Sequence, residues 1–260
     1  GKYLISLLSG HIGRANEWCS KLAVRIGAMP VITTATDARG MFAVDIFATE
    51  HNMRIVNPVM IKDISGRILN NEPVGITGND KYKNLLKVTE ERWNGQIKYT
   101  DNSNNEYESG VQIITGKDDK IVFKRTLKLV PQELAVGIGC KKGKSAHEIE
   151  RAVKKTFDKA GLLLEAIAVV ASVDRKADEA GIIEFARKCK VPYKTYTPEY
   201  LRDVEGDFVS SAFVEEQIGV GNVCERSAGA ASSGGEKLVG KTADNGVTVA
   251  IYRVAQKNKE

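Results

Sequence analysis

The sequence predicts an α/β protein: two three-layer α/β lobes with mainly parallel sheets, joined by a small central module. Short apolar runs alternate with helical patterns near both ends of the chain, which is typical of βα units. Glycine-rich turns follow several of these runs, and two packed units are expected for a chain of 260 residues. We expect an N-terminal lobe over residues 1–78, a central module or linker over 79–130, and a C-terminal lobe over 131–260.

In the N-terminal lobe, the spacing of apolar residues predicts alternating strands and helices. The expected strands are Tyr3–Leu8, Pro30–Ile32 and Val74–Thr77, and the expected helices are Asn16–Ile26, a segment around Ala43–Phe47, and Asn57–Leu69. Trp18, Leu22 and Ile26 share one face of the first helix. Because the chain enters a strand almost at its first residue, we expect part of this lobe to precede Gly1.

Residues 79–130 are polar, rich in turn residues and weakly periodic, which predicts a connecting module with strands at 111–114 and 121–130. After Pro131 the alternation of strand and helix returns. The expected strands are Leu134–Ile138, Ile167–Val173, Pro192–Tyr196 and Val247–Tyr252, and the expected helices are Ser145–Phe157 and Ile182–Cys189. Ser145 and Glu148 have the spacing of a capping box.

The composition narrows the class of protein. Hydrophobic residues make up 42% and charged residues 27%, and no apolar run reaches the roughly 18 residues of a membrane helix. The first residues lack the pattern of a signal peptide. The cysteines are scattered without a CxxC pair, which argues against a zinc cluster or a disulfide framework; they are Cys19, Cys140, Cys189 and Cys224. We therefore expect a soluble, cytoplasmic protein with no metal site and no membrane contact.

The charge balance is mildly basic. Lys plus Arg number 38 and Asp plus Glu 33, which gives a net charge of +5. This excess suits an anionic ligand. Aromatic residues are only 7%, so the interleaved aromatics of an RNA-binding surface are missing, and no nucleic-acid partner is expected.

The first glycine-rich turn, SGHIGRANE, follows the first expected strand. Gly10 and Gly13 allow the backbone to approach a ligand closely, and the helix that begins near Asn16 supplies free N–H groups for an anion. His11 has an unperturbed pKa near neutrality. The alternative interpretation is a tight turn with a surface histidine.

The second turn, TTATDARG, follows the second expected strand. The loops at the carboxyl ends of neighbouring strands in an α/β sheet converge on one crevice. There Asp37 would orient His11 or a water molecule. Taken alone, the Thr and Asp residues are more often a helix cap.

The third turn, GIGCKKGKSA at 137–146, differs in glycine spacing from dinucleotide and Walker motifs. Lys141, Lys142 and Lys144 surround a glycine turn at a helix start, where carboxylates or phosphates bind favourably. The lysines would lower the pKa of Cys140 and make it a nucleophile. Alternatively, Cys140 is a small packing residue.

The fourth turn, SVDRKADEAG at 172–181, is densely charged and follows another expected strand. A solvated, self-compensating loop is an equally good interpretation of this segment. Its position beside the third turn favours a binding function. Lys241 is a smaller candidate.

Taken in this order, the motifs resemble the CbiG family of cobalamin biosynthesis, the cobalt-precorrin-5A hydrolases, with a C-terminal lobe similar to CobE. The resemblance rests on SGHIGRAN with PVITTATDARGMFAVDIFA, VGIGCKKGKSA, SVDRKADEAG, FVEEQIGVGNVCERSA and KTADNGVTVAIY, and it runs from residue 3 to about 252. One departure is Gly13-Arg14, where the family usually has two glycines.

The resemblance implies a reaction. A δ-lactone on a cobalt-containing corrinoid is opened with water as the second substrate, and the extruded carbon leaves as acetaldehyde, giving cobalt-precorrin-5B. No protein-held cofactor is expected, because the cobalt arrives with the substrate. His11 is the expected base or acid, with Asp37 orienting it and Ser9 or Thr34 donating to the oxyanion.

The remaining residues are expected to bind the carboxylate-rich substrate. They are Gly10, Gly13, Asn16, Gly139, Cys140, Lys141, Lys142, Lys144, Ser172, Asp174, Lys176, Asp178, Glu179 and Lys241. Two other functions stay open: a non-catalytic corrinoid-binding or carrier protein, and a phosphate- or nucleotide-binding α/β protein. The oligomeric state is also open, with a homodimer or contacts with other pathway enzymes as alternatives.

Overall fold

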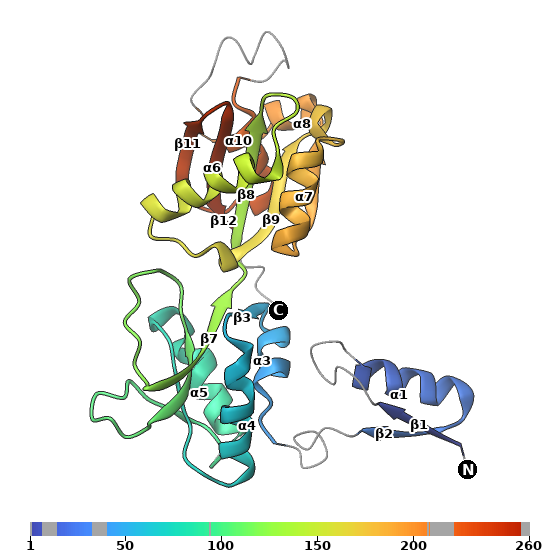
Figure 1. Ribbon diagram of the computed structural model, residues 1–260, viewed down its shortest axis with the longest axis vertical. Coiled ribbons are helices and arrows are strands. Elements are labelled where there is room, and N and C mark those ends of the chain that lie inside the picture. Colours follow the sequence, from blue (N-terminus) through green and yellow to red (C-terminus); the bar gives the residue numbers. More distant parts are fainter. Residues whose placement is uncertain are drawn as a thin grey trace. The chain divides into compact units, whose positions relative to one another are not determined.

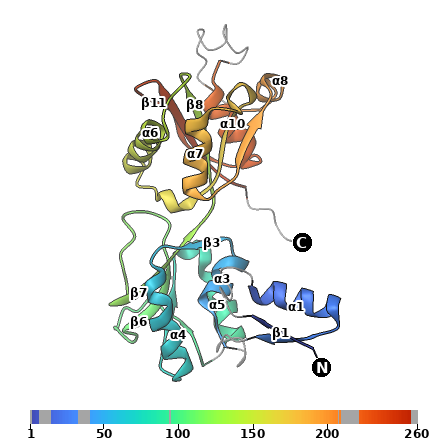
Figure 2. The same ribbon diagram turned by 45° about the vertical axis from the view of Figure 1, so that its right-hand side comes forward.

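The structure, a computed structural model, describes residues 2–6, 15–32, 41–93, 95–206, 208 and 221–255. The chain divides into two compact units, Gly1–Pro131 and Gln132–Glu260. Figures 1 and 2 show the chain from two sides, with helices packed on a mainly parallel five-stranded sheet in each unit. The expected α/β class is confirmed. None of the helices formed by the described residues is both long enough and apolar enough to cross a bilayer.

The N-terminal segment is one βαβ unit. Strands β1 (Tyr3–Ser6) and β2 (Met29–Ile32) pair in parallel, and helix α1 (Ala15–Ile26) connects them. The helix buries its small residues Cys19 and Ala23, and the Cys19 thiol donates a hydrogen bond to a carbonyl of β1. The larger apolar residues of the expected face are exposed; they are Trp18, Leu22 and Ile26.

A second sheet occupies the rest of the first unit, in the order β3-β7-β6-β4-β5. All but β3 run parallel to their neighbours. The strands are β3 (Met53–Ile55), β4 (Gly75–Thr77), β5 (Lys98–Tyr99), β6 (Ser109–Ile113) and β7 (Arg125–Pro131). The helices are α3 (Val44–Glu50), α4 (Ile61–Leu69) and α5 (Lys83–Arg92), with 3₁₀ turns at Pro58–Met60 and Asp80–Tyr82. One apolar core joins the helices to the sheet.

This sheet crosses the boundary expected at residue 78, because β4 pairs with both β5 and β6. The polar segment 79–130 therefore shares its core with residues 41–78. The sequence did not predict α5, since the helix buries only Leu86 and Thr89. The strand expected at 121–130 begins only at Arg125, since the Phe123 ring covers glycines of β4 and β6.

The C-terminal sheet has the order β10-β9-β8-β12-β11. The strands are β8 (Leu134–Cys140), β9 (Ile167–Val173), β10 (Tyr193–Tyr196), β11 (Lys237–Asp244) and β12 (Val247–Arg253). Strands β8, β9 and β10 are parallel, and β12 is antiparallel to β8. Helices α6 (Ala146–Lys159) and α7 (Ala180–Cys189) cover one face, and α10 (Val223–Ser232) covers the other (Figure 1).

The close packing of α10 on β8 requires a glycine. A Cβ atom at Gly137 would overlap the carbonyl oxygen of Cys224. Three elements of this lobe were not predicted from the sequence: α10, the edge strand β11 and the short helix α8 (Pro198–Arg202). Helix α10 was missed because its buried residues are mostly small. The structure confirms the other expected elements of this lobe within one or two residues.

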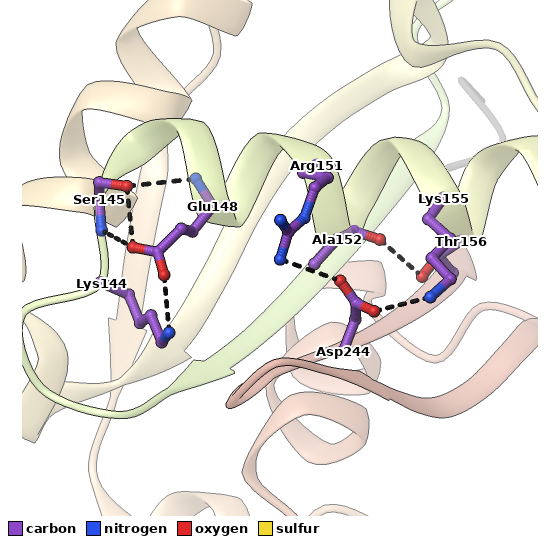
Figure 3. Close-up of polar contacts among 8 residues, drawn as sticks. All are labelled: Lys144, Ser145, Glu148, Arg151, Ala152, Lys155, Thr156 and Asp244. Carbon is purple, nitrogen blue, oxygen red and sulfur yellow. Dashed lines mark hydrogen bonds and ion pairs between the residues drawn. The ribbon is translucent and has the colours of Figure 1, made fainter.

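The capping box predicted at the start of α6 is present (Figure 3). The Glu148 amide donates to Ser145 Oγ at 3.3 Å, and the Ser145 amide donates to Glu148 Oε2 at 3.0 Å. Lys144 Nζ lies 2.7 Å from Glu148 Oε1. This ammonium, followed by the Ser145 amide and hydroxyl, lowers the pKa of Glu148 to about 2. Further along α6, Arg151 and Lys155 pair with Asp244 at the end of β11 (Figure 3).

Gly137→Ala is expected to destabilise the protein, because a methyl group would meet backbone atoms that cannot rotate away. Overpacking of this kind costs about 1–3 kcal/mol, measured as the free energy of unfolding in urea. Gly66→Ala is the matched control. A Cβ at Gly66 meets nothing within 4 Å in helix α4, so this change is expected to be neutral or stabilising. Equal stability of Gly137→Ala and wild type would contradict the close packing.

The pKa of Glu148 gives a second test. A carboxyl titration by NMR, assigned with Glu148→Gln, is expected to give a pKa of about 2 rather than 4.5. Ser145→Ala is expected to raise the pKa. Because the folded pKa is depressed, the stabilisation is present above pH 4.5 and is lost as the pH falls towards 2. An ordinary pKa at Glu148 would show that the capping box does not form in solution.

Candidate functional site

Polar loops gather at one edge of the C-terminal sheet, where β8, β9 and β10 end; we call this the carboxyl edge. The loops 141–145 and 174–179 follow β8 and β9. The turn between β11 and β12 reaches the same edge, because Val247 pairs with Cys140. Helices α6, α7 and α10 begin there, since each runs back along the sheet. Helix N-termini offer free N–H groups and a positive dipole end, so the edge favours anions.

Glu179 joins the two loops. Its Oε1 accepts a hydrogen bond from the Gly143 amide at 2.8 Å, and its Oε2 lies 2.8 Å from Lys176 Nζ. Gly143 has a φ of +80°, a conformation that favours glycine. The hydrogen bond from Lys176 is the largest of the effects that lower the pKa of Glu179. The expected neighbours on loops 141–145 and 174–179 are thus brought together.

The lysines of the third turn differ in whether their ammonium groups are free to bind an anionic ligand. Lys144 is half-buried and paired with Glu148. Lys141 and Lys142 are exposed, and neither forms a salt bridge with another residue that the structure describes. The Lys141 amide donates to Gly246 at 2.9 Å, which ties the loop to the β11–β12 turn. Two ammonium groups therefore face solvent on a backbone that is held in place.

Cys140 does not have the lowered pKa that would make it a nucleophile. Burial raises the pKa of its thiol, and the opposing effects of Lys176 and Lys144 are smaller. The thiol therefore stays protonated at neutral pH, and the hypothesis of an activated Cys140 is wrong. The alternative, a packing residue at the end of β8, fits the structure.

Ser172 lies beneath the carboxyl edge rather than on it. Its side chain is fully buried, and its hydroxyl donates to Ile138 at 2.6 Å. Tyr193 lies beside it and donates from its hydroxyl to the Lys176 carbonyl at 2.8 Å. Burial raises the pKa of Tyr193 to about 12. Sequence reasoning missed this tyrosine, because its position in a short strand gave no sign of the contact with the charged loop.

The two aspartates of the fourth turn have different surroundings. Asp178 is exposed. Asp174 is half-buried, and its Oδ1 is shielded from solvent without a hydrogen-bond partner among the described residues. A carboxylate oxygen in this condition has unused capacity to accept a proton or a hydrogen bond. Asp174 is therefore a candidate acid–base or ligand-binding group.

A second set of polar contacts involves residues of α10, β11 and β12. Thr248 Oγ1 donates to the Gly139 carbonyl at 3.3 Å. Burial raises the pKa of Cys224 to about 11 despite the nearby charge of Lys241. The Lys241 amide donates to the carboxylate of Glu225. Glu225 and Thr248 were also missed, since they reach the site only through long-range contacts.

The structure does not describe the candidate residues of the first two glycine-rich turns. Ser9, Gly10, His11, Gly13, Thr34 and Asp37 all lie outside the described residues. Asn16 lies in the first turn of α1, and its side chain is likewise outside the described part of the structure.

Three family models match consecutive parts of the chain. The Cobalamin synthesis G N-terminal model matches residues 1–37, the Cobalamin biosynthesis central region matches 42–138, and the Cobalamin synthesis G C-terminus matches 134–252. The cobalt-precorrin-5A hydrolase of Salmonella typhimurium is 33% identical over 254 residues, which are 96% of this chain and 71% of that protein. The enzyme of the same name from Priestia megaterium is 28% identical over 211 residues, 78% of this chain and 56% of that protein.

Two solved structures are also similar. The crystal structure of CobE, a protein of the cobalamin biosynthetic pathway, has a TM-score of 0.46 and 29% identity, and covers 49% of this chain and 94% of its own. A cobalamin biosynthesis protein G homologue from Sulfolobus solfataricus has a TM-score of 0.40 and 22% identity, and covers 98% of this chain and 71% of its own.

The motifs that resemble this family lie in the matched regions, and the relative from Salmonella typhimurium aligns over nearly the whole chain. The chain belongs to the cobalamin biosynthesis protein G (CbiG) family and has a role in cobalamin biosynthesis.

Proposed function

We propose that this chain is a cobalt-precorrin-5A hydrolase, which opens the δ-lactone of its substrate and releases the extruded carbon as acetaldehyde to give cobalt-precorrin-5B. The names of the relatives support this reaction. The observation that carries the proposal on this chain is the exposed pair Lys141 and Lys142 on the loop before α6. A macrocycle bearing acetate and propionate carboxylates would bind to such a pair.

The reaction has two steps, both driven by proton transfer. Water adds to the lactone carbonyl and the ring C–O bond breaks, which leaves a carboxylic acid and an alcohol. The alcohol then loses its proton, the neighbouring C–C bond breaks, and the fragment departs as acetaldehyde. The electron pair of that bond stays with the macrocycle, which takes up a proton. A base and an acid are therefore needed, and each contributes roughly 10²–10⁴-fold to the rate.

His11 is the proposed base or acid, with Asp37 orienting it and Ser9 or Thr34 stabilising the oxyanion. In the C-terminal lobe, Asp174 is the proposed second acid–base group, because its Oδ1 has no hydrogen-bond partner among the described residues. The cobalt arrives with the substrate, so we propose no cofactor held by the protein. The partners are then the cobalt-corrinoid intermediate and water.

Incubation with cobalt-precorrin-5A under anaerobic conditions, with trapping of acetaldehyde, tests the reaction. The proposal predicts acetaldehyde in an amount equal to the substrate consumed, and a loss of about 10²-fold or more in kcat for His11→Ala. Tight binding without aldehyde would contradict the hydrolase and support the alternative, a corrinoid carrier. Unchanged turnover by His11→Ala would contradict the role of the histidine.

The lysine pair makes a separate prediction. Lys141→Met with Lys142→Met is expected to raise KM roughly tenfold and leave kcat nearly unchanged, because charge-assisted hydrogen bonds that hold the rim are made equally in ground and transition states. Lys154→Met, at another exposed lysine on α6, is the matched control and is expected to match wild type. An unchanged KM in the double variant would contradict substrate docking on this loop.

A further inference from the structure

Glu225 is a buried carboxylate that the proposed reaction does not use. It lies in the first turn of α10 with an exposed fraction of 1%. Removing a carboxylate from water costs several kcal/mol unless its contacts compensate. Its Oε2 lies 3.6 Å from Lys237 Nζ and accepts no hydrogen bond from any described residue. Its Oε1 accepts a hydrogen bond from the backbone N–H of Lys241, so this carboxylate is bonded to the backbone of β11 at Lys241.

Lys241 lies in a β-bulge of β11. The pairing of β11 with β12 shifts between Val239 and Thr242, so that Gly240 and Lys241 together oppose Ala250. A bulge leaves a backbone group without its ladder partner and re-aims the side chain there. Glu225 supplies the missing acceptor. Gly240 leaves room for it, because a Cβ at that position would lie 3.2 Å from Glu225 Oε1.

The bulge decides where the charge of Lys241 lies. The Lys241 side chain is half-buried, and its charge acts on Cys224. The Cys224 carbonyl packs directly against Gly137 of β8. Lys241 is thus held on the α10 face of the sheet, on the edge strand β11; strand β12 lies between it and β8, whose following loop carries Lys141 and Lys142. Cations therefore lie at two separate places in this lobe: Lys141 and Lys142 follow the end of β8, and Lys241 lies on β11 level with Gly137.

We propose that Glu225 is a positioning residue, which fixes the bulge so that Lys241 binds a further carboxylate of the macrocycle on the α10 face of the C-terminal sheet. The inference rests on the proposed function for the identity of the ligand. The separation of Lys241 from Lys141 and Lys142 makes the site selective for a ligand with carboxylates spread over a wide rim, since one carboxylate cannot reach both places.

A double-mutant cycle tests this role. The readouts are KM and kcat for acetaldehyde release, and the Kd for uroporphyrin, a polycarboxylate macrocycle, by fluorescence quenching. Lys241→Met is expected to raise the uroporphyrin Kd and the KM roughly tenfold. Glu225→Ala is expected to do the same, and the double variant to be no worse than Lys241→Met alone. Glu225→Gln is expected to restore most of the affinity, because its amide oxygen still accepts the Lys241 amide.

Gly240→Ala keeps the test decisive if Glu225→Ala does not fold. Its methyl group displaces the carboxylate by a few tenths of an ångström, and it is expected to raise the Kd severalfold in wild type and not in Lys241→Met. Additive effects of the Glu225 or Gly240 changes and Lys241→Met would overturn the inference. So would an equal uroporphyrin Kd for Lys241→Met and wild type. Absence of acetaldehyde with wild type would instead contradict the hydrolase proposal, and the uroporphyrin cycle would still decide the role of Glu225.

Discussion

Contact between helices and backbone at two glycines shapes the C-terminal lobe. At Gly137 the first turn of α10 lies directly on β8, and at Gly181 the first turn of α7 lies on the backbone of Lys144. Any side chain at either glycine would overlap main-chain atoms. The contact at Gly181 places the N-terminus of α7 beside that of α6, and the contact at Gly137 places the N-terminus of α10 on the opposite face of the sheet. The carboxyl edge therefore combines the positive ends of three helices with the loops after β8 and β9.

Internal carboxylates then decide which cations remain available. Glu148 pairs with Lys144, and Glu179 pairs with Lys176 while it holds the Gly143 amide. Two of the candidate lysines thus maintain the shape of the loops, and Lys141 and Lys142 face solvent. A rigid loop with a few free cations suits a rigid anionic ligand, because less conformational freedom is lost on binding.

Much of this fold could be predicted from the sequence, since local patterns fix most of its elements. The capping box at Ser145 and the strand β9 are examples, because spacing and β-branched composition suffice. The boundary at residue 78 was wrong, because α5 buries so few residues that its polar sequence resembles a linker. Helix α10 was missed for the related reason that small residues pack it against Gly137.

Part of the candidate site could likewise be predicted from the sequence, and part depends on packing between distant segments. Topology alone predicts that the loops after β8 and β9 meet, and Glu179 joins them through Gly143. The environment of Cys140 could not be predicted, because its pKa depends on how burial compares with the nearby lysines. The contact of Glu225 could not be predicted from the sequence either, since its partner, the Lys241 amide, lies in a bulge of another element.

Binding of the macrocycle at the carboxyl edge of the C-terminal sheet is the proposal on which the roles of Lys141 and Lys142 depend. Hydrogen exchange followed by mass spectrometry, with and without cobalt-precorrin-5A, tests it most directly. If the macrocycle binds there, amide exchange is expected to be slower in peptides covering 141–145 and 174–179, with little change in those covering β3 and α4. Protection confined to the first unit, with both loops unchanged, would contradict it.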